Sequence, residues 1–187
     1  MLIESANTTA ASPHVSSRFR TAWIIALLAL PTFLFVWFNR DVPHFGVLQD
    51  DGLYFGSAKS IAEGTGYKVL SIPGTPPQTK YPPLYPLLLS LAWRIQPSYP
   101  ETLSVAILLT WLWVPVVLAL IYGWCRRQEL PSRITWLVTG LFALNPYVLF
   151  FAGNLMSEIF FMAFLFVSIW AAEQRDQRDW KWPLIAG

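Results

Sequence analysis

Two adjacent carboxylates, Asp50 and Asp51, are the residues of this chain whose type and position best suit chemistry. Acidic residues are scarce, 11 in 187 residues against 13 basic ones, and this pair follows a strongly apolar segment. A carboxylate can take a proton from a reacting hydroxyl, so the pair predicts proton chemistry at a bilayer surface. The alternative is structural, because Asp at a helix start accepts hydrogen bonds from the first N–H groups.

The composition indicates an integral membrane protein. The chain is 55% hydrophobic and 13% charged, whereas soluble domains carry about 25% charged residues. The formal net charge of +2 gives no reason to expect nucleic-acid binding. The single cysteine, Cys125, excludes an internal disulfide framework, and we interpret it as an inert, small apolar residue.

Four apolar segments are candidates for membrane spans, which take about 20 residues each. They cover residues 22–38, 103–124, 134–151 and 155–172. The predicted fold class is therefore all-α and integral to the membrane. The first segment has no small-residue cleavage site after it and does not resemble a signal peptide.

Basic residues predict how these segments are oriented. They cluster before the first segment, between the second and third, and after the fourth: Arg18 and Arg20; Arg126, Arg127 and Arg133; Arg175, Arg178 and Lys181. If all four segments span, the clusters share one side, which the positive-inside rule makes cytoplasmic. The long loop of residues 39–102 then faces outward. Residues 1–20 are predicted to form a disordered cytoplasmic tail.

The outer loop contains two predicted short helices that lie on the membrane. The first starts at Asp50 or Asp51 and ends near residues 64–66. Helical spacing gives it an apolar side with Tyr54, Ala58, Ile61 and Ala62 and a polar side with Ser57, Lys59, Ser60 and Glu63. After a proline-rich stretch, residues 84–94 form the second helix, which is too short to span.

Several runs of residues, in order along the chain, resemble the motifs of one family. They are Asp50-Asp51-Gly52-Leu53-Tyr54 with Ala58 and Ala62-Glu63-Gly64-Thr65-Gly66-Tyr67; Tyr81-Pro82-Pro83-Leu84-Tyr85-Pro86-Leu87-Leu88-Leu89; and Asn145-Pro146 with Met156-Ser157-Glu158-Ile159-Phe160. Residues 21–187 resemble the N-terminal portion of the GT-C membrane glycosyltransferases. The closest likeness is to the bacterial aminoarabinose and protein mannosyl transferases, including the Rgt-like branch.

This resemblance implies an inverting transferase that moves a sugar from a polyprenyl-phosphate donor to an acceptor hydroxyl at the outer membrane face. Asp50 matches the first acid of the family pair and would be the base that takes the hydroxyl proton. Asp51 and Glu158 would orient groups or help to bind a divalent cation. The resemblance leaves open whether a metal is present, and oxygen ligands of this kind would suit one.

The resemblance also implies substrate-binding residues. Lys80 or Arg94 would pair with the donor phosphate, and Tyr54 and Tyr81 would contact the substrate. Family members often carry His or Lys directly before the Pro-Pro element, where this chain has Tyr81. A tyrosine hydroxyl can bond a phosphate but supplies no charge.

Two other classes of protein stay open. A transporter for a lipid-linked substrate would favour charged residues within its spans, and apart from Glu158 the four segments nearly lack them. A non-catalytic membrane assembly subunit would tolerate replacement of both Asp50 and Asp51. We also expect residues 181–187 to begin a fifth span, so that the chain is part of a larger enzyme and is inactive alone.

Overall fold

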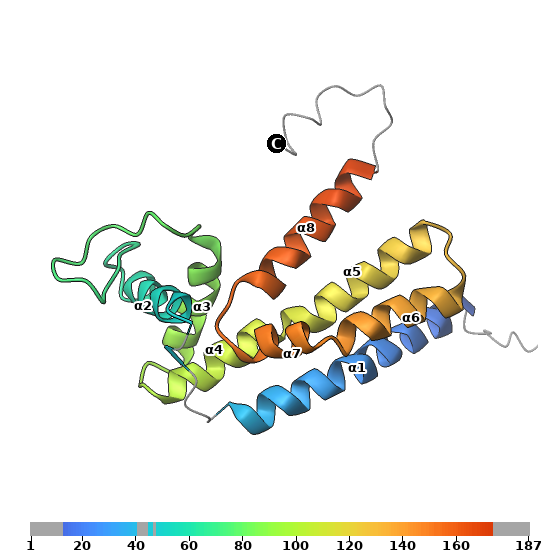
Figure 1. Ribbon diagram of the computed structural model, residues 1–187, viewed down its shortest axis with the longest axis horizontal. Coiled ribbons are helices and arrows are strands. Elements are labelled where there is room, and N and C mark those ends of the chain that lie inside the picture. Colours follow the sequence, from blue (N-terminus) through green and yellow to red (C-terminus); the bar gives the residue numbers. More distant parts are fainter. Residues whose placement is uncertain (1–12, 41–44, 47, 174–187) are drawn as a thin grey trace, which may run out of the picture.

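The computed structural model describes residues 13–40, 45–46 and 48–173, and that part of the chain contains helices and no strand. In chain order the helices are α1 (Pro13–Asn39), α2 (Asp50–Ala62), α3 (Leu84–Ile95), α4 (Glu101–Trp111), α5 (Trp113–Arg127), α6 (Ser132–Ala143), α7 (Pro146–Gly153) and α8 (Glu158–Glu173). Figure 1 shows α1, α5 and α6 running side by side, with α2 and α3 together at one end of them. The prediction of an all-helical fold is confirmed for these residues.

Two helical stretches of the described residues are long and apolar enough to cross a membrane. The first is Arg18–Asn39, 22 residues that remain one helix through Pro31. The second is Glu101–Arg127, 27 residues contributed by α4 and α5 together. The two helices meet at Leu112 because Pro115 has no N–H to donate to the carbonyl group of Trp111.

The third and fourth predicted spans are not confirmed. Helices α6 and α7 form a pair bent by 50°, which counts as a span only if the pair crosses as one unit. The bend lies at Asn145, whose side chain accepts a hydrogen bond from the Tyr147 N–H at 2.9 Å and caps α7. Helix α8 has 16 residues, about 24 Å at ~1.5 Å per residue, against a hydrocarbon core of ~30 Å. Within the described residues, two helices, or three spans if the bent pair is one, are long and apolar enough to cross a membrane, and four spans are not confirmed.

Close packing joins the long helices. The Trp111 indole N–H of α4 donates to the Thr32 hydroxyl of α1 at 3.1 Å, and its ring centroid lies 4.9 Å from that of Phe33. Helices α5 and α8 approach each other at Gly123, where an added Cβ would lie 2.9 Å from the Trp170 ring. These contacts fix the helices whose ends carry the polar residues discussed below.

Helices α2 and α3 pack on each other, and α3 packs on α4. The Trp93 indole N–H donates to the carbonyl oxygen of Phe55 at 3.2 Å, and the two rings lie 4.7 Å apart. The Tyr85 hydroxyl of α3 forms a 2.8 Å hydrogen bond with the Thr110 hydroxyl of α4. Both helices occur where they were predicted, and this packing attaches them firmly to the long helix α4–α5.

The prediction of a polar side on the first short helix is wrong for two residues. Ser57 and Ser60 are 1% and 0% exposed. The chain after α2 folds back over the helix: the Ser60 hydroxyl donates to the carbonyl oxygen of Gly66 at 2.7 Å. Lys68 then pairs with Pro77 in an isolated antiparallel bridge. Helix α2 is thus packed against α3 and partly covered by its own loop, and its predicted position on the membrane stays a prediction.

Some predictions fall on parts of the chain outside the described residues. These are residues 1–12 of the predicted tail, the basic cluster after residue 173 and the start of the predicted fifth span. Helix α1 begins at Pro13, inside the segment predicted as a disordered tail. Arg126 and Arg127 lie in the last turn of α5, at the end opposite α2 and α3 (Figure 1).

Candidate functional site

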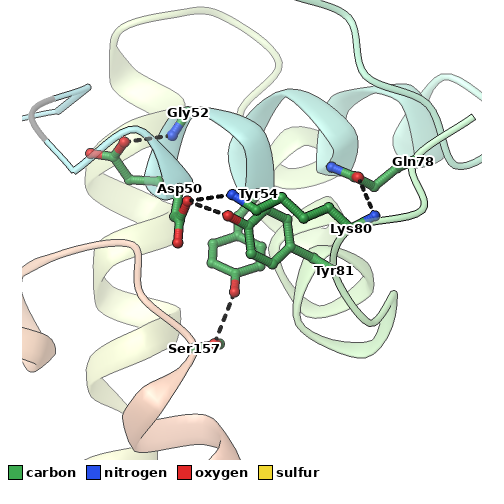
Figure 2. Close-up of polar contacts among 8 residues, drawn as sticks. Asp50, Gly52, Tyr54, Gln78, Lys80, Tyr81 and Ser157 are labelled. Carbon is green, nitrogen blue, oxygen red and sulfur yellow. Dashed lines mark hydrogen bonds and ion pairs between the residues drawn. The ribbon is translucent and has the colours of Figure 1, made fainter. Parts of the chain in front are cut away.

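Asp50 is the first residue of α2, and its carboxylate faces two side chains from the loop before α3 (Figure 2). Its Oδ1 accepts a hydrogen bond from the Tyr81 hydroxyl and lies 3.5 Å from the Lys80 Nζ. Both contacts fall on the same oxygen, and no donor among the described residues contacts Oδ2. One oxygen of Asp50 is held in place while the other is available to accept a proton.

Asp51, the next residue, is placed quite differently. It is 1% exposed. Its Oδ2 accepts the Gly46 N–H at 2.7 Å and its Oδ1 accepts the Gly52 N–H at 2.6 Å. Since both oxygens are committed to the backbone, the geometry favours a structural role for Asp51. Its predicted share in the chemistry stays a prediction.

The turn that delivers Asp50 is strained. Gln49 has φ 57° and ψ −46°, and the Asp50 N–H donates to the carbonyl oxygen of Leu48 at 2.6 Å. This is a γ-turn with a positive central φ, a rare conformation that glycine adopts most easily. Such strain persists only where neighbouring contacts impose it. Here the buried Asp51 carboxylate ties the turn at Gly46 to the start of α2.

The loop between α2 and α3 brings Lys80 and Tyr81 to Asp50 through a short series of hydrogen bonds. The Gln78 N–H donates to the Tyr67 carbonyl oxygen at 2.9 Å, and the Gln78 side-chain oxygen accepts the Lys80 N–H at 2.9 Å. The Tyr67 hydroxyl then donates to the Tyr81 carbonyl oxygen at 2.9 Å. Burial raises the pKa of Tyr67 to about 12, so this hydroxyl stays a donor at neutral pH.

Tyr54 connects this loop to the start of α8. Its hydroxyl and that of Ser157 are 3.1 Å apart and share a hydrogen bond (Figure 2). Its ring centroid lies 4.7 Å from that of Tyr81 and 5.1 Å from that of Tyr85. Burial raises the pKa of Tyr54, which keeps the hydroxyl protonated beside the carboxylates. Tyr54 therefore lies between Asp50 and the second acidic residue.

Glu158, the first residue of α8, is that second acid. Its side chain is half-buried, and Oε2 is buried with no hydrogen-bond partner among the described residues. Asp50 is close enough for the two like charges to interact. A buried carboxylate oxygen without a donor is costly, by roughly 1–3 kcal/mol. Glu158 is thus brought to the same site as Asp50 and Tyr54, from a segment about 100 residues later in the chain.

Arg94, a predicted phosphate ligand, is not brought to this site. It lies near the C-terminal end of α3, ten residues after Leu84, so ~15 Å of helix separates it from the end near Asp50. Of the two predicted phosphate ligands, Lys80 is therefore the one that lies beside the Asp50 carboxylate. The supporting residues that were not predicted are Tyr67, Gln78 and Ser157. The motifs that resemble the family include Tyr67 and Ser157, so two of the three could have been found from the sequence.

No cluster of three or more His, Cys, Asp or Glu side chains that could hold a metal ion occurs in residues 13–40, 45–46 and 48–173. Of the three predicted oxygen ligands, Asp51 uses both oxygens to accept backbone N–H groups, so Asp50 and Glu158 remain. Two carboxylates are fewer than a Ca²⁺ site takes, whereas Mg²⁺ is usually held by one or two carboxylates together with phosphate and water. A bound cation would need ligands from a substrate or from water.

An apolar pocket of about 320 Å³ opens beside the polar residues. Tyr54 and Ser157 line it on the side of Asp50, and most of the other lining residues are apolar, including Pro82, Leu84, Phe161 and Phe164. Volumes of this size are typical of small-molecule sites. The arrangement therefore combines a charged end, formed by Asp50 and Lys80, with an adjoining apolar space between α3 and α8.

Comparisons with known proteins add no relative: the chain matches no family model, no curated protein and no solved structure. The likeness to the GT-C glycosyltransferases therefore rests on the sequence motifs alone. Membership of that family stays a prediction.

Proposed function

We propose that this chain is the N-terminal part of a membrane glycosyltransferase that uses a polyprenyl-phosphate sugar as donor. The acceptor hydroxyl attacks the anomeric carbon, the bond from that carbon to the phosphate oxygen breaks, and the configuration inverts. Asp50 takes the hydroxyl proton, and the electron pair of the broken bond leaves with the polyprenyl phosphate. A phosphate is a fair leaving group, so the reaction depends chiefly on a base and on positioning.

One observation carries this proposal: Tyr54 packs on Tyr81 beside Asp50 and Lys80 and also lines the apolar pocket. A polyprenyl-phosphate sugar likewise has a charged part, the phosphate, next to an apolar chain. The pocket between α3 and α8 would take the first part of that chain. The phosphate would then lie at the polar rim, within reach of a lysine.

Asp50 suits the role of base better than its neighbour. Its Oδ2 has no donor among the described residues, whereas both oxygens of Asp51 accept backbone N–H groups. A general base must have a lone pair directed at the reacting hydroxyl. Asp51 would lose the contacts that hold the turn before α2 if it turned toward a substrate.

Lys80 suits the role of phosphate ligand. Its side chain is 66% exposed and its contact with Asp50 is long, at 3.5 Å. Exposed ion pairs of this kind hold the side chain only weakly. Lys80 can therefore move to a donor phosphate, where a charge-assisted hydrogen bond is stronger. By the positive-inside rule the site would face outward, since Arg126 and Arg127 lie at the other end of α5.

Replacement of Asp50 by Asn tests this proposal. Membranes from cells that produce the protein from its complete gene would receive undecaprenyl phosphate linked to radiolabelled mannose, glucose, galactose or aminoarabinose. We expect Asp50→Asn to reduce transfer by about 100-fold or more, because general bases contribute roughly 10²–10⁴-fold. The matched control is Glu63→Gln, an exposed acid that pairs with Lys59 just beyond the other end of α2.

Equal transfer by Asp50→Asn and the unaltered protein, at equal amounts in the membrane, would contradict the proposal. Absence of transfer from every donor by the unaltered protein would contradict it as well. Loss in both Asp50→Asn and Glu63→Gln would show that the effect is not specific to the site.

A further inference from the structure

The Tyr81 side chain is enclosed by its neighbours. Its ring centroid lies 4.7 Å from that of Tyr54, and the Lys80 Nζ lies 4.6 Å from the Tyr81 ring. The Tyr67 hydroxyl holds its carbonyl oxygen at 2.9 Å. Tyr54 and Tyr67 come from other parts of the chain, and they hold the ring and the backbone of Tyr81 respectively. Tyr81 is therefore poorly suited to be a loose surface for a sugar ring.

The one polar atom of this side chain points at Asp50. The Tyr81 hydroxyl donates to Asp50 Oδ1 (Figure 2). Burial, and then the hydrogen bond to Asp50, raise the pKa of Tyr81, so the hydroxyl keeps its proton and can only donate to the carboxylate. Tyr81 was predicted from the sequence as a substrate contact, but its hydroxyl is already directed at the proposed base.

We propose that Tyr81 is the positioning residue of Asp50. This inference rests on the proposed function. The terminal torsion of an aspartate is broad and would leave the carboxylate free to rotate. A hydrogen bond from a fixed tyrosine to Oδ1 removes that freedom and directs Oδ2 at the place where an acceptor hydroxyl must arrive. Orientation of a reacting group is a large part of what an active site provides.

Lys80 cannot serve this purpose, although it contacts the same oxygen. Its side chain is two-thirds exposed and its contact is long, at 3.5 Å. When Lys80 moves to the donor phosphate, Tyr81 is the remaining contact on Oδ1 among the described residues. Asp50 thus keeps its orientation during the step in which it accepts the proton.

The inference is tested with Tyr81→Phe, which keeps the ring contacts to Tyr54 and Lys80 and removes only the hydroxyl. We expect kcat to fall by roughly ten- to a hundredfold, the range of a hydrogen bond to a charged group. We expect KM for the donor to stay within about twofold, because Tyr81 acts through Asp50 and does not bind the phosphate. The donor is the undecaprenyl-phosphate sugar that gives the highest transfer in the panel above.

Three further variants complete the design. Replacement of Tyr81 by p-aminophenylalanine keeps the ring and puts an N–H donor where the hydroxyl was, so part of kcat should be kept. Tyr99→Phe is the matched control, since Tyr99 is 60% exposed and its ring neighbours Phe45, while the hydrogen bonds to Asp50 come from Lys80 and Tyr81. The double variant Asp50→Asn with Tyr81→Phe should be no less active than Asp50→Asn alone, because residues that act as a unit are not additive.

The outcomes separate this inference from the proposed function. If Asp50→Asn abolishes transfer while Tyr81→Phe keeps its kcat, the positioning role is wrong and the proposed function stands. A rise in donor KM with unchanged kcat in Tyr81→Phe also overturns the inference and makes Tyr81 a donor contact. If Asp50→Asn is fully active, the proposed function itself falls. If the Tyr81→Phe protein is absent from the membrane, the p-aminophenylalanine variant is measured in its place, alone and combined with Asp50→Asn. Additive losses of kcat in that pair count against the inference.

Discussion

The two ends of helix α8 carry the same kind of side chain in opposite environments. Glu173 accepts hydrogen bonds on Oε1 from the Trp124 indole at 2.9 Å and the Gln128 amide at 3.0 Å. Its Oε2 lies 3.9 Å from the Arg127 guanidinium. Glu158, at the start of the same helix, has an oxygen that is buried and has no donor among the described residues.

This difference indicates that the Glu173 end of α8 serves stability, whereas the Glu158 end does not. The contacts of Glu173 all come from the end of α5, and they join two helices that already pack closely at Gly123. Glu158 instead follows Ser157, which lines the pocket, and is close enough to Asp50 for the two carboxylates to repel each other. Buried polar atoms without partners are few in folded proteins and call for a reason. A substrate hydroxyl that donates to Glu158 is the reason that the proposed function supplies.

The most direct way to break this comparison is to replace Glu158 by Gln. The amide has nearly the same shape and removes the charge, so transfer should fall by about tenfold or more if Glu158 accepts from a substrate hydroxyl. Stability should stay equal or rise, because a buried charge with an unpaired oxygen is lost. Transfer in membranes and thermal unfolding in detergent, followed by tryptophan fluorescence, measure the two effects. Unchanged transfer with lower stability would make Glu158 a structural residue like Glu173.

A change in the α5–α8 contact close to Glu173 tests whether this end of α8 serves stability. Gly123→Ala places a methyl group 2.9 Å from the Trp170 ring, so we expect a loss of about 1–3 kcal/mol from overpacking. Gly140→Ala is the matched control, since its Cβ would meet Leu28 at 3.9 Å, an ordinary contact. The control should be neutral or slightly stabilising because alanine favours helix. Equal stability of the two variants would mean that α5 and α8 do not pack as closely as described.

Much of the helical organisation could be predicted from the sequence. Long apolar runs identified α1 and the α4–α5 helix, and the residues at the starts of α2 and α3 located both short helices. The third predicted span was bent at Asn145 because a polar cap and the following proline outweighed the apolar content. Burial of Ser57 and Ser60 was not predicted, since it depends on a loop that folds back over α2.

The candidate site was predicted only as a set of residues. Asp50 contacts side chains 30 and 31 positions later in the chain, and Tyr54 contacts Ser157 across 103 positions. Such distances cannot be read from local spacing, because they depend on how a proline-rich loop and a later helix return to α2. The sequence also did not show that Asp51 would be buried and Asp50 partly exposed. Neighbouring residues on a helix point about 100° apart, and only tertiary packing decides which of them is buried.

The smallest expected effect is that of replacing Glu173, which tests directly whether the two ends of α8 act independently. Glu173→Ala removes the contacts to Trp124, Gln128 and Arg127, all partly exposed, so unfolding should become easier by only about 1 kcal/mol. Transfer, compared at equal amounts of protein, should not change, because these contacts lie at the end of α8 remote from Asp50. Glu63→Ala is the control for loss of an exposed acid. A clear fall in transfer by Glu173→Ala would mean that the contacts of Glu173 help to position the other end of α8. The unpaired oxygen of Glu158 would then result from the position of the helix, and the two ends of α8 would not be independent.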